Sequence, residues 1–236
     1  MAKTSSKNTT VMIGAFNMSG FFNSLETSIE VDMLDTTTFG DDSKTFIAGM
    51  QNGTITLGGL FGGDVDEIDE EMNPTLGAVA ASVVSTIVDG IGTQGNNANL
   101  MGARTSSYGK NGSADGVVSI SVGFQGDGIQ TGIVLKTLAQ QTSSGNTATV
   151  DDGAGTTNGA VAHLHVTAAD NGNVDVNVQD SPNDSAWSDL ITFANVTTTP
   201  TAERGSVSGT VDRYVRAEWV GAATPDHTFA VTFARL

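Results

Sequence analysis

The chain has 236 residues, enough for one large or two small domains with a buried core. Charged residues make up only 15% of it, Gly reaches 29 and Cys is absent, which is typical of an all-β protein with many turns and excludes disulfide and thiolate chemistry. The formal net charge of −16 argues against specific binding of DNA or RNA, because phosphate contacts need clustered Lys and Arg.

The N-terminal residues 1–10 are polar and predict a flexible arm without the apolar centre of a secretory signal. The longest mainly apolar run, residues 76–88, is too short to span a bilayer. We therefore expect a protein that is made in the cytoplasm and does not associate with a membrane.

The first regular feature is a strand, a polar excursion and a second strand over residues 29–61. Ile29, Val31 and Met33 alternate with acidic residues, which predicts a strand whose apolar side chains face the core. Between the strands, residues 38–46 read as a long polar loop with a Phe near each end. Loops of this length are usually functional or disordered, and isolated apolar residues in them favour a contact surface for another chain.

Residues 64–72 are the best helix candidate, with Asp64 as cap and Glu67 three residues later as in a capping box. Alternation then predicts strands at 83–88, 100–108, 117–124 and 129–138. The sequence at 90–95 matches GxGxxG, but the residues after it predict a strand where a dinucleotide site needs a helix. We interpret it as a plain loop.

Residues 139–159 are rich in Ser, Thr, Gly and Asn and nearly free of large apolar side chains, so they predict a linker. Short alternating strands follow to the C-terminus and indicate a small antiparallel β-sandwich, Ig-like or jelly-roll-like. The predicted organisation is a first domain at 1–138, a linker at 139–159 and an outer domain at 160–236.

Candidate chemistry is sparse. His163 and His165 project from one strand face and could chelate a metal together with His227 or a carboxylate, but a solvent-facing strand is the favoured interpretation. The acidic segment 64–71 lacks the Gly and the ligand spacing of an EF-hand loop. No nucleophile elbow and no cleft of carboxylates and aromatics is visible, so we expect no enzyme, no metal and no cofactor.

The segment 29–61 carries a resemblance. An acidic strand is followed by Asp-Thr-Thr-Thr-Phe-Gly-Asp at 35–41, Phe-Ile-Ala-Gly-Met-Gln-Asn-Gly-Thr at 46–54 and an alternating strand. This pattern resembles the tail tube (major tail) proteins of long-tailed, siphovirus-type bacteriophages over about residues 11–138. The fragment at 174–193 resembles accessory sandwich domains of phage virion proteins. The resemblance implies a mainly β fold: a tail-tube β-sandwich or barrel with one short helix, then the second sandwich.

The same resemblance implies a structural virion protein in the phage tail, made in the host cytoplasm and assembled as stacked, hexameric rings through which DNA passes without specific binding. The tape measure protein and tail-end proteins would be its partners. The loop predicted to contact the neighbouring ring, and to become ordered only there, comprises Thr38, Phe39, Gly40, Asp41, Asp42, Ser43, Lys44, Thr45 and Phe46. The side chains predicted to face the lumen are Glu30, Asp32, Thr54, Thr56, Ser119, Ser121 and Thr131. A capsid decoration or adhesion module of a phage particle is the alternative.

Overall fold

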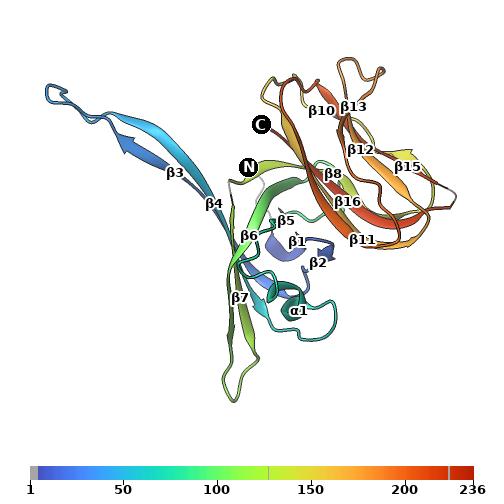
Figure 1. Ribbon diagram of the computed structural model, residues 1–236, viewed down its shortest axis with the longest axis horizontal. Helices are drawn as coiled ribbons and strands as arrows, with labels where there is room; N and C mark the ends of the chain where they lie inside the picture. Colours follow the sequence, from blue (N-terminus) through green and yellow to red (C-terminus); the bar gives the residue numbers. More distant parts are fainter. Residues whose placement is uncertain (1–4, 127, 223) are drawn as a thin grey trace. The chain divides into compact units, whose positions relative to one another are not determined.

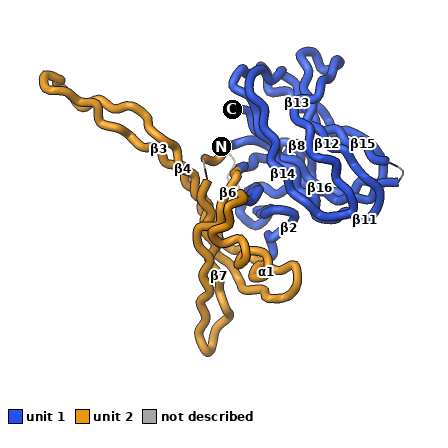
Figure 2. The backbone as a smooth tube through the Cα atoms, viewed as in Figure 1, with its two compact units in different colours: residues 1–20, 82–100, 130–236 blue, residues 21–81, 101–129 orange. Residues whose placement is uncertain are grey.

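A computed structural model describes residues 5–126, 128–222 and 224–236. It divides into two compact units, each built from separate stretches of the chain (Figure 2). Unit 1 comprises residues 1–20, 82–100 and 130–236, and unit 2 comprises residues 21–81 and 101–129. Residues 1–4 of the predicted N-terminal arm lie outside the described part of the chain.

The described residues are mainly β, with antiparallel sheets and one short α-helix, as predicted (Figure 1). Unit 2 contains β3 (Phe22–Asp35), β4 (Phe46–Leu60), α1 (Ile68–Met72), β7 (Ser119–Gly126) and most of β6 (Asn97–Asn111). Unit 1 contains η1 (Ser6–Asn8), β1 (Thr10–Ile13), β2 (Phe16–Asn17), β5 (Ser82–Ile87), β8 (Gln130–Gln141), β9 (Gly145–Asn146), β10 (Val150–Asp151), β11 (Ala160–Asn171), β12 (Val174–Ser181), β13 (Ser188–Thr192), β14 (Thr201–Val207), β15 (Tyr214–Gly221) and β16 (Asp226–Arg235).

Unit 2 is an antiparallel sheet in the order β3-β4-β7-β6. One face buries alternate apolar residues, among them Ile55 of β4 and Phe124 of β7, which lie opposite each other in the register. Tyr108 of β6 shares this face, and its hydroxyl donates a hydrogen bond of 2.9 Å to Asp69 of α1. Helix α1 therefore lies over the apolar face, where Ile68 is fully buried.

The helix is shorter than the predicted 64–72, because the residues before it form a turn. Asp66 has a φ of 62°, which lies in the left-handed region and cannot belong to an α-helix. The backbone N–H of Asp64 donates to a carboxylate oxygen of Glu67 at 2.9 Å, so half of the expected capping box is present. The predicted cap thus shapes the turn that leads into α1 at Ile68.

Unit 1 is built from two sheets. The first sheet has the order β14-β11-β16-β8-β6-β5-β1-β2. Only the first residues of β6 pair with β8 in this sheet. The second sheet has the order β10-β15-β12-β13, and β9 also pairs with β15. Alternate residues of β11 and β16, such as Leu164 and Phe229, form one core with Val176 of β12 and Val215 of β15. This is a β-sandwich in which strands from both ends of the chain share a sheet.

The division at residues 138 and 139 does not match these units. Strand β8, assigned from the sequence to the first domain, pairs with β16 at the C-terminal end of the chain. Within the predicted linker, β9 and β10 both pair with β15. Small polar residues usually indicate a flexible segment, but here they form turns and short strands that pair with β15.

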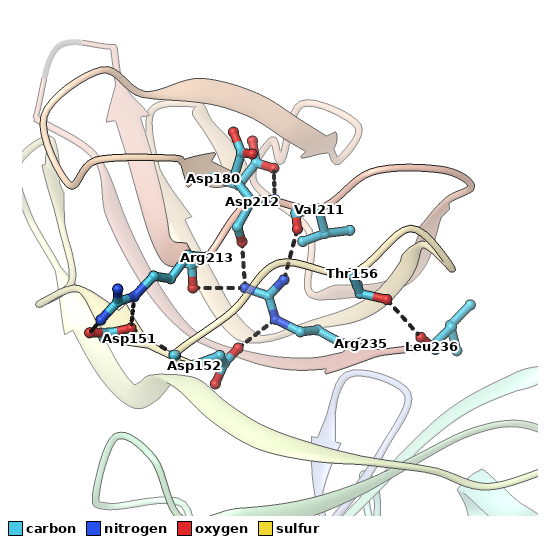
Figure 3. A network of polar contacts seen from close by, with 10 residues as sticks. Asp151, Asp152, Thr156, Asp180, Val211, Asp212, Arg213, Arg235 and Leu236 are labelled. Atoms are coloured by element: carbon cyan, nitrogen blue, oxygen red, sulfur yellow. Dashed lines mark hydrogen bonds and ion pairs between the residues drawn. The ribbon is translucent and has the colours of Figure 1, made fainter.

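Two Arg side chains fix this segment to the end of the chain (Figure 3). Arg213 makes a bidentate ion pair with Asp151, with both distances at 2.6 Å. Arg235 pairs with Asp152 and donates to the backbone carbonyl oxygens of Val211, Asp212 and Arg213. Because bidentate guanidinium contacts hold a fixed geometry, residues 151–152 are part of the fold of unit 1.

The strand with the two His residues is also different from its prediction. His163 and His165 of β11 are fully buried, and not solvent-facing. The alternation of β11 is real, but its second face packs against β5 and the β1–β2 turn, where Ser85 and Gly14 contact the rings. An alternating strand is exposed on one face only when nothing covers that face. The sequence does not show that the N-terminal strands cover this face of β11.

The partners of these two rings determine where their protons lie. The carbonyl oxygen of Gly14 can only accept, so His165 donates from Nδ1 (2.8 Å) and its Nε2 accepts from the Ser85 hydroxyl (2.9 Å). Arg204 can only donate, so His163 accepts at Nε2 (3.0 Å) and donates from Nδ1 to Ser85 (3.0 Å). Both rings are therefore neutral, and burial lowers the pKa of His165 to about 4 and that of His163 well below its usual value.

We predict that a fragment beginning at residue 147 will not fold cooperatively by itself. It lacks β8, so β16 keeps β11 but loses its second neighbour in the sheet, and the core loses Leu135. Urea denaturation of this fragment, compared with the full chain, checks the expectation. A single sharp transition with native-like circular dichroism in the fragment would contradict it and restore the predicted domain boundary.

We also predict that the protein loses stability as the pH falls from about 6.5 to about 4. The folded-state pKa values of His163 and His165 lie below those of the unfolded chain, so the unfolded state binds more protons in this window. His165 alone accounts for up to roughly 3 kcal/mol. Urea midpoints between pH 7 and pH 4.5 measure the loss, which His165→Gln should reduce; a midpoint that stays constant over this range would exclude the effect.

Candidate functional site

The most prominent feature of unit 2 is a two-stranded arm. Strand β4 has β3 and β7 as neighbours from Gly53 onward, but residues 29–52 form a hairpin of β3 and β4 alone that projects from the sheet (Figures 1 and 2). Both strands are longer than the sequence predicted, Phe46 begins β4, and the loop between the strands comprises residues 36–45. We call residues 29–52 the arm.

The base of the arm depends on a glycine. A Cβ atom on Gly53 would lie 2.9 Å from the backbone of Gly128, which is too close for any side chain. Gly53 thus allows the segment after β7 to pass directly against β4 where the hairpin leaves the sheet. Beyond this point each strand of the arm has only one neighbour, and isolated two-stranded hairpins are marginally stable in water.

One face of the arm carries what we call the apolar stripe: Ile29, Val31, Met33 and Phe46. The cross-strand register places them on the face that buries Ile55 and Leu57 nearer the centre of the sheet. A β-bulge between Val31 and Met33 gives β4 one extra residue, which keeps Phe46 on this face. All four side chains are 44–61% exposed, whereas Ile55 and Leu57 are fully buried.

The sequence therefore predicted the face of these residues correctly but not their environment. Ile29, Val31 and Met33 were expected to face the core, yet the core ends before the arm begins. The alternation of β3 continues unchanged through both regions, because pleating sets which face a side chain takes but not whether another element covers it. The opposite face of the arm adds Leu34 and Ile47, which are paired and also exposed.

The tip of the arm is shaped by its own hydrogen bonds. Asp41 accepts from both the backbone N–H and the hydroxyl of Thr38, at 2.7 and 3.1 Å. Thr36 and Thr45 close the hairpin through a backbone bond of 2.9 Å and a hydroxyl contact of 3.1 Å. The loop predicted to order only beside a neighbouring ring thus has internal hydrogen bonds to part of its backbone. Phe39 at the tip is fully exposed.

Six of the seven residues predicted to face a lumen lie on one face of the unit 2 sheet. The register aligns Glu30 and Asp32 of β3, Thr54 and Thr56 of β4, and Ser119 and Ser121 of β7 on the face opposite Ile55. We call these six residues the polar face; none of them is buried. Thr131 lies apart from them, on β8 of unit 1 beside Asn99 of β6.

The other candidates from the sequence are three His residues, an acidic segment and a Gly-rich loop. Both ring nitrogens of His163 and of His165 are used in hydrogen bonds, and His227 donates separately to Thr197. The carboxylates of Asp66, Glu70 and Glu71 approach within 4.8 Å of one another, and their mutual repulsion adds to burial in raising the pKa of Glu71. The loop at 90–95 leads into strand β6, as its interpretation as a plain loop requires.

Comparisons with known proteins give structural similarity only. No family model and no curated protein matches the chain. The virion of a native gene transfer agent particle contains a chain that is 12% identical, covering 55% of this chain and 98% of its own length at a TM-score of 0.44. The tail of an empty gene transfer agent particle, solved with C6 symmetry, gives 17% identity, coverage of 50% and 91%, and a TM-score of 0.39.

The Dit protein of phage SPP1, described as a hub of the adsorption apparatus in phages that infect Gram-positive bacteria, matches along 97% of this chain and 99% of its own. The identity is 11% and the TM-score 0.38. These TM-scores are low, so the similarities do not establish a shared function. Among the described residues, no helix is long and apolar enough to cross a membrane.

We predict that the apolar stripe contributes little to the stability of the subunit. Val31→Ala and Met33→Ala should each change the free energy of unfolding by about 0.5 kcal/mol or less, because neither side chain is in the core. The matched control is Ile55→Ala on the same face, which should cost roughly 2–5 kcal/mol. Urea denaturation of dilute protein measures all three; equal losses would show that the arm is packed in the isolated subunit.

Proposed function

We propose that this chain is a structural subunit of a phage tail, which polymerises as stacked, hexameric rings to form the tail tube. The main support for the proposal is the arm. Its apolar stripe continues the face that forms the core of unit 2, but the four stripe side chains remain about half exposed. The sequence resemblance to tail tube proteins supports the same conclusion. The proposal assigns the chain no catalytic step and no cofactor.

The apolar stripe can supply energy for assembly. Fully burying a large apolar side chain contributes about 1.5–3 kcal/mol, and the four stripe residues are already about half covered. One arm would therefore gain roughly 3–6 kcal/mol on docking against a second copy, which offsets only the lower part of the cost of about 4–15 kcal/mol for bringing two molecules together. Docking becomes favourable when each subunit makes several contacts at once, as it does in a closed ring.

Open strand edges offer a second contact. Strand β3 pairs with β4 alone among the described strands, so its outer edge presents unpaired backbone groups along residues 22–35. Such an edge is a template for a strand from another chain, and closure into a ring removes it. We propose that β3 of one copy joins the sheet of the next, and that the arm reaches the neighbouring ring.

The polar face would then line the tube. It carries Glu30 and Asp32 among hydroxyl side chains, so it offers negative charge and small polar groups. DNA phosphates are repelled by such a surface and pass without being retained. The tape measure protein would occupy the lumen during assembly, and tail-end proteins would cap the tube.

We predict that replacing both Phe39 and Phe46 by Ser leaves the subunit folded but abolishes tubes. Phe39 is fully exposed and Phe46 is about half exposed, so neither side chain contributes much to the fold of the isolated subunit. We expect both to be buried at an interface with another copy. Electron microscopy of purified protein, with light scattering for mass, measures assembly. Val117→Ser is the matched control, because Val117 is an exposed apolar residue of unit 2 outside the arm.

Two results would contradict the proposal. Tubes that form from the double variant at unchanged concentration and salt would show that the arm tip is not an assembly contact. Wild-type protein that stays monomeric or trimeric would instead favour the alternative of a capsid decoration or adhesion module.

An exposed Asp42–Lys44 contact across rings would contribute little to assembly compared with burial of the two Phe side chains, because surface ion pairs are worth about 0–1 kcal/mol.

A further inference from the structure

A cluster of aromatic and planar polar side chains lies on the outer face of the second sheet of unit 1. We call it the Trp187 cluster: Gln179 of β12, Asp189 of β13, Arg216 and Glu218 of β15, and Trp187 just before β13. The register places Gln179 directly opposite both Arg216 and Asp189. The alternate residues of these strands, such as Val178 and Ala217, are buried in the sandwich core. The cluster therefore faces away from the core.

Mutual contacts hold the cluster in place. The guanidinium carbon of Arg216 lies 4.3 Å from the centre of the Trp187 ring. Its Nε donates to the side-chain oxygen of Gln179 at 2.9 Å, and the amide nitrogen of Gln179 donates to Asp189 and to Glu218, both at 2.9 Å. Gln179 thus fixes three charged side chains at once, which lowers the entropy cost of binding a ligand to them.

These contacts leave several groups available. Within the described part of the chain, the two terminal nitrogens of Arg216 and the second carboxylate oxygen of Asp189 and of Glu218 make no hydrogen bond or ion pair with protein. Asp189 is exposed, while Arg216, Glu218 and Trp187 are partly exposed. Donors and acceptors therefore stand side by side next to an aromatic ring.

The chemistry of the cluster selects its ligand. Two carboxylates and one guanidinium give it a charge of −2 + 1 = −1, which disfavours phosphates and nucleic acids. A hydroxyl group both donates and accepts, so adjacent hydroxyls can bridge the guanidinium and a carboxylate. The C–H face of a sugar ring is apolar and can pack on the amphipathic ring of Trp187. We propose that the Trp187 cluster binds an uncharged carbohydrate.

Saturation-transfer NMR on the full-length protein tests this site. The probes are uncharged oligosaccharides of glucose, galactose and N-acetylglucosamine, with inorganic phosphate and a Lys-rich peptide as charged comparisons. At least one oligosaccharide should show transfer, and Trp187→Ala should weaken its binding about tenfold or more. Phe61→Ala is the aromatic control, because Phe61 is an exposed residue of unit 2 outside both the cluster and the arm, and it should leave binding unchanged.

A second variant separates ligand contact from local structure. Glu218→Gln keeps an oxygen to accept from Gln179 but removes a charge, so it should preserve the thermal transition while reducing affinity for the sugar. Absence of transfer to every oligosaccharide would overturn the proposal. Binding that is unchanged in Trp187→Ala, or binding of the Lys-rich peptide alone, would overturn it as well.

Discussion

The structure of unit 2 depends on one constraint, that a β-strand cannot change the face of its side chains without a bulge. Strands β3 and β4 keep the same apolar face from the buried sheet into the arm, where nothing covers it. Near the centre of the sheet, helix α1 covers the apolar face. It buries Ile68 there, and its Asp69 accepts a hydrogen bond from Tyr108 of the sheet. The arm thus has the side chains of a core but lacks its second layer, and this makes it suitable for contact with another chain.

The same alternation also produces the opposite surface. Every residue of the polar face lies between residues of the apolar face, so a shift of one position in the register would bury Thr56 and expose Ile55. Exposing Ile55 and Leu57 loses the free energy of burying two large apolar side chains, which favours the observed register. One pattern in two strands therefore specifies both the proposed contact between rings and the proposed lining of the tube.

Unit 1 follows a different principle, because its strands come from three separate parts of the chain. Strand β11 is buried on both faces: one faces the sandwich core, and the other places His163 and His165 against Ser85 of β5. Buried polar groups must be paired, and here each ring nitrogen has a partner. The outer face of the second sheet needs no such closure, which is why the Trp187 cluster retains unused hydrogen-bonding groups.

The sequence by itself determined the class of the fold, most of the strands and the face that each alternating residue takes, since these follow from the two-residue period. It also identified the loop at 38–46 as a segment with exposed apolar residues, from Phe39 and Phe46. Tertiary structure alone decided what covers each face: it left Ile29 to Met33 exposed, buried His163 and His165, and tied residues 151–152 to the C-terminal strands. Pairing between residues far apart in the chain makes these decisions, and local periodicity contains no information about such partners.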